Sequence, residues 1–378
     1  MKVGLTATMI QGGRSGVAQY VFSLVRELNR AGNVDLNVFV LEDELPLLDS
    51  AKSACRLIPV PRAAAPPVKN ILWHQLTLPK LAAELKLDVL HVPSYRRLVR
   101  SAPCPTVGTI HDLAPFQVKG KYDLARMFYG RVVVKSLARA QREIIAVSHC
   151  TARDIENFFA IPQGRMHVIH NGIDHDRFFP GDIDVARAWT AEKHQLTAPY
   201  FLYVSRLEHP GKNHVRLIEA FVKFKQTTGS DWQLALGGGD WHGCEAIKSA
   251  AAASPFASDI RFLGFVPDSD LPHLYRAARA MVYPSLFEGF GLPPVEAMAC
   301  GTPVISSIRG ALEEVVANAA LIVDPEDVVD IARTLTEFMR DQGLADSLKL
   351  KGITNAARFH WSRTASEVTE VYEKAAGR

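Results

Sequence analysis

The sequence has little that would mark a secreted, membrane-spanning or disordered protein. Its 378 residues include five widely separated cysteines and no C-x-x-C pair, so we expect neither a disulfide framework nor a cysteine zinc site. No apolar run approaches the roughly 18 residues of a spanning helix. The opening segment, MKVGLTATMI, has one lysine and no cleavage site typical of a signal peptide. The sequence therefore predicts a cytoplasmic globular protein, and its length favours two domains.

The chain also has little excess of either charge, since 43 Lys and Arg are balanced by 40 Asp and Glu. Residues 96–142 are the exception, because ten basic residues there face only two acidic ones. The ten are Arg96, Arg97, Arg100, Lys119, Lys121, Arg126, Arg131, Lys135, Arg139 and Arg142. This region favours either contact with an anionic lipid surface or phosphorylated acceptor, or a solvated helix face that is balanced elsewhere. No nucleic-acid partner is expected.

Strand and helix patterns alternate along the chain. A short strand at 2–9 is followed by a glycine turn at 11–16, a helix with apolar positions from Val17 to Leu28, and a strand at 36–41. This βαβ unit implies a parallel sheet. Further strands are predicted at 89–92, 106–110, 144–147, 166–169, 200–204, 233–236, 260–264, 281–283, 303–306 and 320–323, and helices at 214–227 and 328–341.

The alternation is interrupted once, by the polar stretch 174–193, which contains Pro180-Gly181 and is interpreted as a linker. The fold class is therefore α/β, with two Rossmann-like, doubly wound domains. Ligands bind outside the carboxyl ends of the strands in such sheets, so the chemistry is expected in loops that follow strands. Three Asp-x-Asp pairs occur, but they lie in the linker or at a helix start, so no metal site is predicted.

The loop after the strand at 281–283 carries two carboxylates, Glu288 and Glu296, on either side of a helix start at Pro293-Pro294. Free N–H groups at a helix start attract anions, and carboxylates accept hydrogen bonds from neighbouring hydroxyls. A nucleotide sugar, with hydroxyls on both sides of a diphosphate, fits this pattern. The alternative is that Glu296 complements the helix dipole and Glu288 is a surface residue.

Two cations follow the strand at 200–204, in the segment from Ser205 to His214. Arg206 has a planar fork of donors and Lys212 a compact charge, and both suit a diphosphate. Isolated basic residues in a loop are otherwise solvated, and the argument for a site depends on the Glu288–Glu296 loop in the same domain.

The first half of the chain offers His111 and a glycine loop. His111 follows the strand at 106–110, and Asp112 beside it would orient the imidazole or support its charge. A single histidine is otherwise an ordinary polar residue. Gly12, Gly13 and Gly16 allow close approach of the backbone to a ligand, although their spacing departs from the dinucleotide fingerprint Gly-x-Gly-x-x-Gly.

These segments together resemble the retaining GT-B glycosyltransferases of glycosyltransferase family 4. The family's E-x7-E pattern corresponds to Glu288 and Glu296, its Arg…Lys pair to Arg206 and Lys212, and an inter-domain motif to 170–174. The resemblance implies two domains that face each other across a cleft: an acceptor-binding domain at 1–178 and a nucleotide-sugar-binding domain at 179–356. A last helix within 357–378 would cross back to the first domain.

The resemblance also implies the roles of individual residues. Arg206 and Lys212 would hold the donor diphosphate, Glu296 the ribose and Glu288 the transferred sugar, with His111 near the reacting face. The catalytic residues would be His111, Glu288, Arg206 and Lys212. The donor-binding residues would be Gly13, Gly16, Ser205, Arg206, Lys212, Val266, Glu288, Phe290, Gly291, Leu292 and Glu296.

The implied reaction is a metal-independent, cofactor-free transfer of a hexose with retention of configuration. Segments 109–116 and 206–214 resemble bacterial polysaccharide mannosyltransferases that use GDP-mannose, and the implied acceptor is a glycan or a polyprenyl-diphosphate-linked sugar in polysaccharide or lipopolysaccharide synthesis. Peripheral association with the inner membrane face is expected. UDP-sugar or dTDP-rhamnose transferases, a GT-B sugar-nucleotide epimerase and a non-enzymatic nucleotide-sugar-binding subunit are the alternatives.

Overall fold

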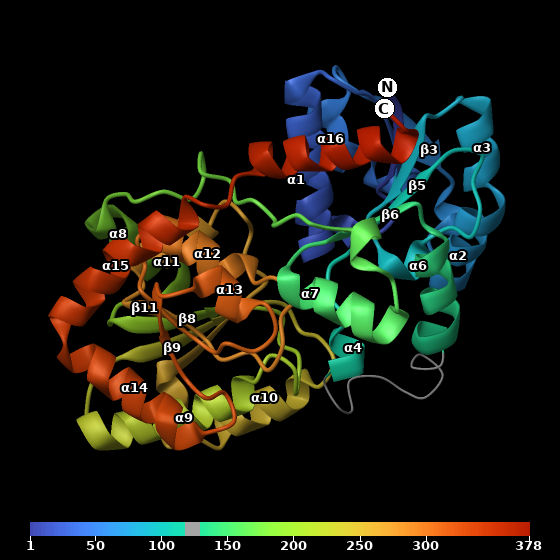
Figure 1. Cartoon of the computed structure of the whole chain (residues 1–378). Coiled ribbons are helices and arrows are strands. Elements are labelled where there is room, and N and C mark those ends of the chain that lie inside the picture. The colour runs from blue at the N-terminus through green and yellow to red at the C-terminus, as the bar shows by residue number, and fades with distance from the viewer. Residues whose placement is uncertain (118–128) are drawn as a thin grey trace. The chain divides into compact units, whose positions relative to one another are not determined.

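The computed structural model describes residues 1–117 and 129–378, which form two compact units (Figure 1). Unit 1 comprises Met1–Gly172 and His360–Arg378, and unit 2 comprises Ile173–Phe359. The boundaries predicted from the sequence, after residues 178 and 356, lie a few residues from these junctions. Phe178 belongs with unit 2 because its ring contacts Tyr275, with the two centroids 5.9 Å apart.

Unit 1 is built on a seven-stranded parallel sheet of order β3-β2-β1-β4-β5-β6-β7. Because the order reverses between β1 and β4, the loops after these two strands flank the switch point at which open α/β sheets bind ligands. The strands are β1 (Lys2–Thr6), β2 (Asp35–Leu41), β3 (Arg56–Val60), β4 (Val89–Val92), β5 (Thr106–Ile110), β6 (Glu143–Ala146) and β7 (Met166–Val168). The α-helices are α1 (Gly16–Ala31), α2 (Pro67–Leu76), α3 (Leu78–Glu84), α4 (Ala114–Gln117), α6 (Lys135–Ala140), α7 (His149–Asp154) and α16 (Trp361–Ala376).

The last helix, α16, belongs to unit 1 and lies beside α1 (Figure 1). Its apolar side bears Trp361, Val368 and Tyr372, which are buried in the same core cluster as the residues of α1 and β1. Gly172 lies against the start of α16, where a Cβ atom would be only 2.1 Å from the backbone nitrogen of Trp361. Any residue other than glycine at position 172 would therefore require the backbone to shift.

Unit 2 has a six-stranded parallel sheet of order β10-β9-β8-β11-β12-β13, with its switch point between β8 and β11. The strands are β8 (Tyr200–Val204), β9 (Gln233–Gly237), β10 (Ile260–Gly264), β11 (Ala280–Tyr283), β12 (Val304–Ser306) and β13 (Ala320–Ile322). The helices are α8 (Ile183–His194), α9 (His214–Thr228), α10 (Cys244–Ala252), α11 (Leu271–Ala277), α12 (Leu292–Ala299), α13 (Leu312–Val316), α14 (Val328–Arg340) and α15 (Gln342–Ala356).

The predicted α/β class and its two parallel sheets are confirmed, but the linker at 174–193 is wrong over its second half. Helix α8 occupies that half and packs against α11. Asp182 caps α8 by accepting hydrogen bonds from the amides of Asp184 and Val185, at 2.9 and 3.1 Å. The Trp189 ring then stacks on His273, with a centroid distance of 4.6 Å. The polar composition of the segment concealed this helix.

The strand from 2 to 9 is also shorter than predicted, since β1 ends at Thr6. Three basic residues of the 96–142 region, Lys119, Lys121 and Arg126, lie outside the residues that the structure describes. Within the described part of the chain, every helix is too short or too polar to cross a bilayer.

Candidate functional site

A charged cluster lies where two neighbouring strands of unit 2 end. Lys212, in the loop after β8, donates to both carboxylate oxygens of Glu288, in the loop after β11, at 2.6 and 2.8 Å. Ser285 donates to the first of these oxygens at 2.6 Å. The Lys212 and Glu288 side chains are only 16% and 12% exposed, so this pair is largely shielded from bulk water.

The loop that carries Lys212 is fixed from both ends. The hydroxyl of Tyr203, on β8, donates to the Lys212 carbonyl at 2.6 Å. Asn213 adopts a positive φ of 61° and is buried. Its amide nitrogen donates to the carbonyls of Pro284 and Pro325, at 3.0 and 2.6 Å. Since Pro284 immediately precedes Ser285, the same contacts hold both charged loops in register.

Arg206, the second predicted phosphate ligand, lies at the surface of unit 2. Its guanidinium carbon is 4.6 Å from the ring centroid of Trp241, a cation–π contact, and a terminal nitrogen is 3.5 Å from a Glu208 oxygen. Its side chain is 44% exposed and therefore accessible to a ligand. Gly238 makes the close loop packing possible, because a Cβ atom there would meet the Ser205 carbonyl oxygen at 1.8 Å.

The helix start predicted after Glu288 is present. Gly291 precedes α12 with a φ of 102°, a conformation that favours glycine, and a Cβ atom there would lie 2.7 Å from Leu312. Leu292 begins the helix and Pro293 follows in its first turn. Phe290 is buried against Phe359, with the ring centroids 5.5 Å apart. The backbone N–H groups at this helix start make an anion-binding arrangement.

Glu296 is the fifth residue of α12, because the helix begins at Leu292, one residue before the predicted start at Pro293. The Tyr275 hydroxyl donates to its Oε2 atom at 3.0 Å. Burial raises the pKa of Glu296 to about 7, although the Tyr275 hydrogen bond lowers it. Glu296 is thus a carboxyl group whose charge changes near neutral pH. Val266, one of the predicted donor-binding residues, is buried, and Phe265 before it is half exposed.

In unit 1 the glycine loop follows β1. Gly12 and Gly13 have φ values of 67° and 81°, which favour glycine. The Gly12 N–H donates to the Glu44 carboxylate at 2.6 Å, and burial raises the pKa of Glu44. Ser15 caps α1 by accepting from the Ala18 N–H at 3.2 Å, and Gly16 is the first helical residue. The loop is therefore fixed by a neighbouring carboxylate that the sequence did not suggest.

His111 follows β5, as predicted, but its orientation comes from other groups than Asp112. Its Nε2 atom donates to the Pro93 carbonyl at 3.2 Å, and its ring lies edge-on to Tyr20 with a centroid distance of 4.9 Å. Asp112 instead accepts the Ala114 N–H at 3.0 Å. Burial lowers the pKa of His111 to about 4, so the ring is neutral at pH 7, and its Nδ1 atom carries the lone pair.

The hydroxyl of Tyr20 starts a buried hydrogen-bond chain that reaches α16. Tyr20 and Thr109 hydroxyls are 3.2 Å apart, and Thr109 lies 2.7 Å from His91 Nε2. His91 Nδ1 is in turn 2.7 Å from the Tyr372 hydroxyl. This chain connects the surroundings of His111 to the last helix of the protein.

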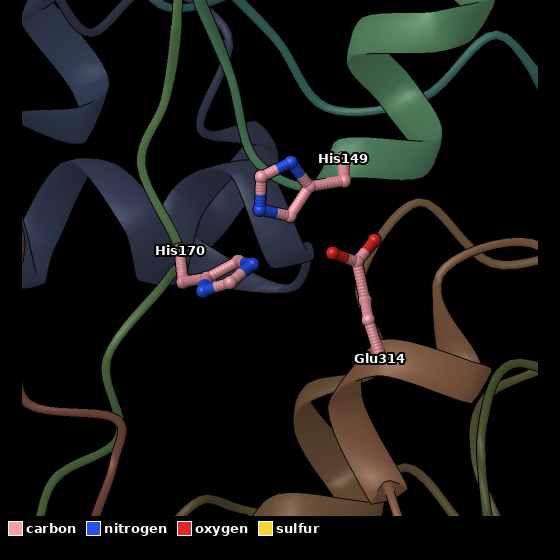
Figure 2. Close-up of side chains that lie close together, drawn as sticks. All are labelled: His149, His170 and Glu314. Carbon is pink, nitrogen blue, oxygen red and sulfur yellow. The ribbon is translucent and has the colours of Figure 1, made fainter.

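Two further histidines of unit 1, His149 and His170, form a pair that the sequence did not predict, because 21 positions separate them (Figure 2). His170 is the first residue of the motif at 170–174, whereas His149 belongs to no motif that the sequence showed. Their ring centroids are 5.8 Å apart and the rings are steeply inclined. Figure 2 also draws Glu314 of α13, which belongs to unit 2.

The structure thus brings Lys212 and Glu288 together and fixes the anion-binding start of α12 beside Glu288 in the chain. It places the glycine loop and His111 separately, in unit 1. The residues that support these groups, Ser285, Tyr275, Trp241 and Glu44, were not singled out in the sequence.

The chain matches the sequence models of two families, Glycosyltransferase Family 4 over residues 14–177 and Glycosyl transferases group 1 over residues 188–358. It is 27% identical to O-antigen chain mannosyltransferase B of Escherichia coli over 99% of this chain and 100% of that protein. It is 30% identical to D-inositol 3-phosphate glycosyltransferase of Frankia alni over 96% of this chain and 95% of that protein.

The fold has close counterparts among solved structures. Alr3699/HepE of Anabaena, solved in complex with UDP-glucose, matches with a TM-score of 0.78 and 17% identity, over 99% of this chain and 100% of that chain. The two parallel-sheet α/β units are accordingly those of the GT-B fold. On the family matches and the full-length relatives together, this chain belongs to glycosyltransferase family 4 and is a mannosyltransferase-like GT-B glycosyltransferase.

Proposed function

We propose that the protein transfers mannose from GDP-mannose, with retention of configuration and without a metal ion, to a hydroxyl of a glycan or lipid-linked acceptor in bacterial polysaccharide or lipopolysaccharide synthesis. The observation that carries the donor site is the shielded Lys212–Glu288 pair at the carboxyl ends of β8 and β11. In this pair the Lys212 ammonium lies within 3 Å of the Glu288 carboxylate, a group that can accept hydrogen bonds from hydroxyls.

In this proposal the ion pair is the resting arrangement of the donor site. The diphosphate of the donor takes Lys212 as its cation, which frees Glu288 to accept hydrogen bonds from the sugar hydroxyls. Arg206, already stacked on Trp241 and accessible, adds a second positive charge. Negative charge develops on the leaving diphosphate as the anomeric bond breaks, so cations fixed in advance stabilise the transition state more than the ground state.

His111 is assigned to the sugar side of the reaction. Because its ring is neutral at pH 7 and Nε2 is committed to Pro93, its Nδ1 lone pair is available to accept a hydrogen bond from a donor hydroxyl. We propose a front-face mechanism, in which the leaving phosphate oxygen takes the proton of the acceptor hydroxyl as the anomeric bond to the phosphate breaks and the new glycosidic bond forms.

The choice of mannose is supported by the similarity to the Escherichia coli relative, an O-antigen chain mannosyltransferase that the chain matches over its full length. A UDP-sugar donor is the principal rival, since the Anabaena structure holds UDP-glucose. A dTDP-rhamnose donor, an epimerase and a non-enzymatic nucleotide-sugar-binding subunit are the remaining alternatives.

The test is binding and slow hydrolysis of GDP-mannose, UDP-glucose, UDP-N-acetylglucosamine and dTDP-rhamnose, each measured with and without EDTA. Saturable binding and hydrolysis confined to GDP-mannose are expected, with binding lost in Lys212→Ala and kept in Lys351→Ala, which changes an exposed lysine of α15. Preference for another donor would refute the mannose assignment, loss of activity with EDTA would refute metal independence, and an epimerised free donor would identify an epimerase. A product of inverted anomeric configuration would refute retention.

A further inference from the structure

A buried arginine of unit 1 carries a positive charge that no carboxylate of the described residues balances. Arg97 lies in the turn after β4 and is 8% exposed. Its Nε atom donates to the Asn70 side-chain oxygen at 2.7 Å and its Nη1 atom to the Arg96 carbonyl at 3.2 Å. Among the described residues, Arg97 makes no ion pair with an Asp or Glu. A buried charge without a counter-ion is costly, so the Arg97 guanidinium in this position favours an anionic partner.

The groups around Arg97 have unused hydrogen-bonding capacity of their own. Asn70 and His74, on consecutive turns of α2, are 1% and 0% exposed. The Asn70 Nδ2 and His74 Nε2 atoms have no hydrogen-bond partner among the described residues. His74 Nδ1 donates to the Asn70 carbonyl at 2.8 Å, so Nε2 of the neutral ring is an acceptor. The cluster thus offers a guanidinium, an amide donor and an imidazole acceptor.

The place of this cluster in the sheet is one where ligands bind. Arg97 follows β4, one of the two strands that flank the switch point of unit 1, and Asn70 lies near the start of α2, the helix that follows β3. Both segments therefore belong to the carboxyl edge of a parallel sheet. The exposed Arg100, three residues after Arg97, is by contrast hydrogen-bonded to Ser136 at 3.3 Å and is an ordinary surface cation.

We propose that Arg97, Asn70 and His74 form an oxyanion-binding site that takes a phosphate or carboxylate group of the acceptor. The guanidinium fork pairs with two oxygens of such a group, and the Asn70 amide donates to one of them. His74 Nε2 accepts from a hydroxyl of the protonated anion or of the sugar that bears it. The assignment of the anion to an acceptor rests on the proposed glycosyltransfer, whereas the site itself is testable without donor or acceptor.

The first experiment is a calorimetric titration of the full chain with inorganic phosphate and, separately, with acetate at pH 7. Arg206→Ala and Lys212→Ala are combined as the background, so that the donor site contributes no binding. One saturable anion site is expected to remain. Adding Arg97→Gln should weaken its Kd at least tenfold, on the order of 1.4 kcal/mol, because the fork is lost. Adding Arg100→Gln should leave the Kd unchanged. Tighter binding of phosphate than of acetate would mark the acceptor group as a phosphate, and the reverse as a carboxylate.

A second variant keeps the proposal testable if Arg97→Gln fails to fold. Asn70→Asp places a carboxylate where the Asn70 oxygen already accepts from Arg97, so it supplies the missing counter-ion internally. This variant should bind phosphate and acetate at least about tenfold more weakly and should melt roughly 2 °C or more above the background, since the buried charge is now paired. Anion binding that persists in Asn70→Asp, or a background that binds no anion at all, would overturn the site. Failure of the nucleotide-sugar panel alone would instead count against the proposed function.

Discussion

Donor affinity is expected to depend on pH through Glu296, and the structure sets the size of the effect. A ribose hydroxyl donates best to a carboxylate, so nucleotide binding favours the ionised form of Glu296. Burial raises the pKa of this group to about 7. The ionised fraction therefore rises from about a tenth at pH 6 to about nine tenths at pH 8. GDP should bind roughly tenfold more tightly at pH 8 than at pH 6, and protons should be released on binding below pH 7.

The assay is calorimetric titration with GDP at pH 6, 7 and 8, in two buffers of different ionisation enthalpy. Glu296→Gln is the matched variant, because its side chain keeps the shape and the Tyr275 contact without titrating. Its GDP affinity should vary little with pH. Protein stability should change with pH in the opposite direction to GDP affinity. Because the pKa of Glu296 is raised in the folded chain, its contribution to the free energy of unfolding is present at low pH and is lost as the pH rises through 7. Equal pH dependence in the wild type and in Glu296→Gln would refute this reasoning.

Three further changes test the donor site and its support. Ser285→Ala removes a hydrogen bond to the charged Glu288 side chain, and kcat/KM for the donor should fall about tenfold or more; an unchanged value would exclude a positioning role. Trp241→Ala removes the aromatic face under Arg206 and should weaken donor binding about two- to tenfold, with thermal stability retained; unaltered affinity would show that the stacked geometry is not the binding one. Gly291→Ala adds a side chain at a residue with a φ of 102° and places it against a leucine of α13. The free energy of unfolding, measured by chemical denaturation, should fall by about 1–3 kcal/mol, and an unchanged value would contradict the local strain.

The sequence predicted those features that depend on periodicity and on order along the chain. Alternating strand and helix patterns indicated the parallel sheets, and the loops after the strands indicated where Lys212 and Glu288 lie. Their pairing could not be predicted, because 76 positions separate them and the spacing within each loop carries no information on the contact. The Tyr275 hydroxyl reaches Glu296 from a different helix for the same reason.

The burial of individual side chains could not be predicted from the sequence either. The basic residues of the 96–142 region are alike in composition, yet Arg97 is buried and Arg100 is exposed. Likewise the pKa of His111 depends on its burial and on the carbonyl of Pro93 rather than on the adjacent Asp112. Helix α8 was missed because one face of a polar segment was enough to pack against α11.

The membership of α16 in unit 1 has a consequence for how the chain folds as it is made. The ribosome completes all of Ile173–Phe359 before the residues that finish the core around α1 have been translated. During synthesis the apolar side of α1 therefore stays uncovered until α16 has been translated. Unit 2, by contrast, is completely synthesised before unit 1 is. A polypeptide that ended at Phe359 would contain all of unit 2 but would lack α16 of unit 1. The buried hydrogen-bond chain from Tyr20 to His91 would then lack its last member, the Tyr372 hydroxyl.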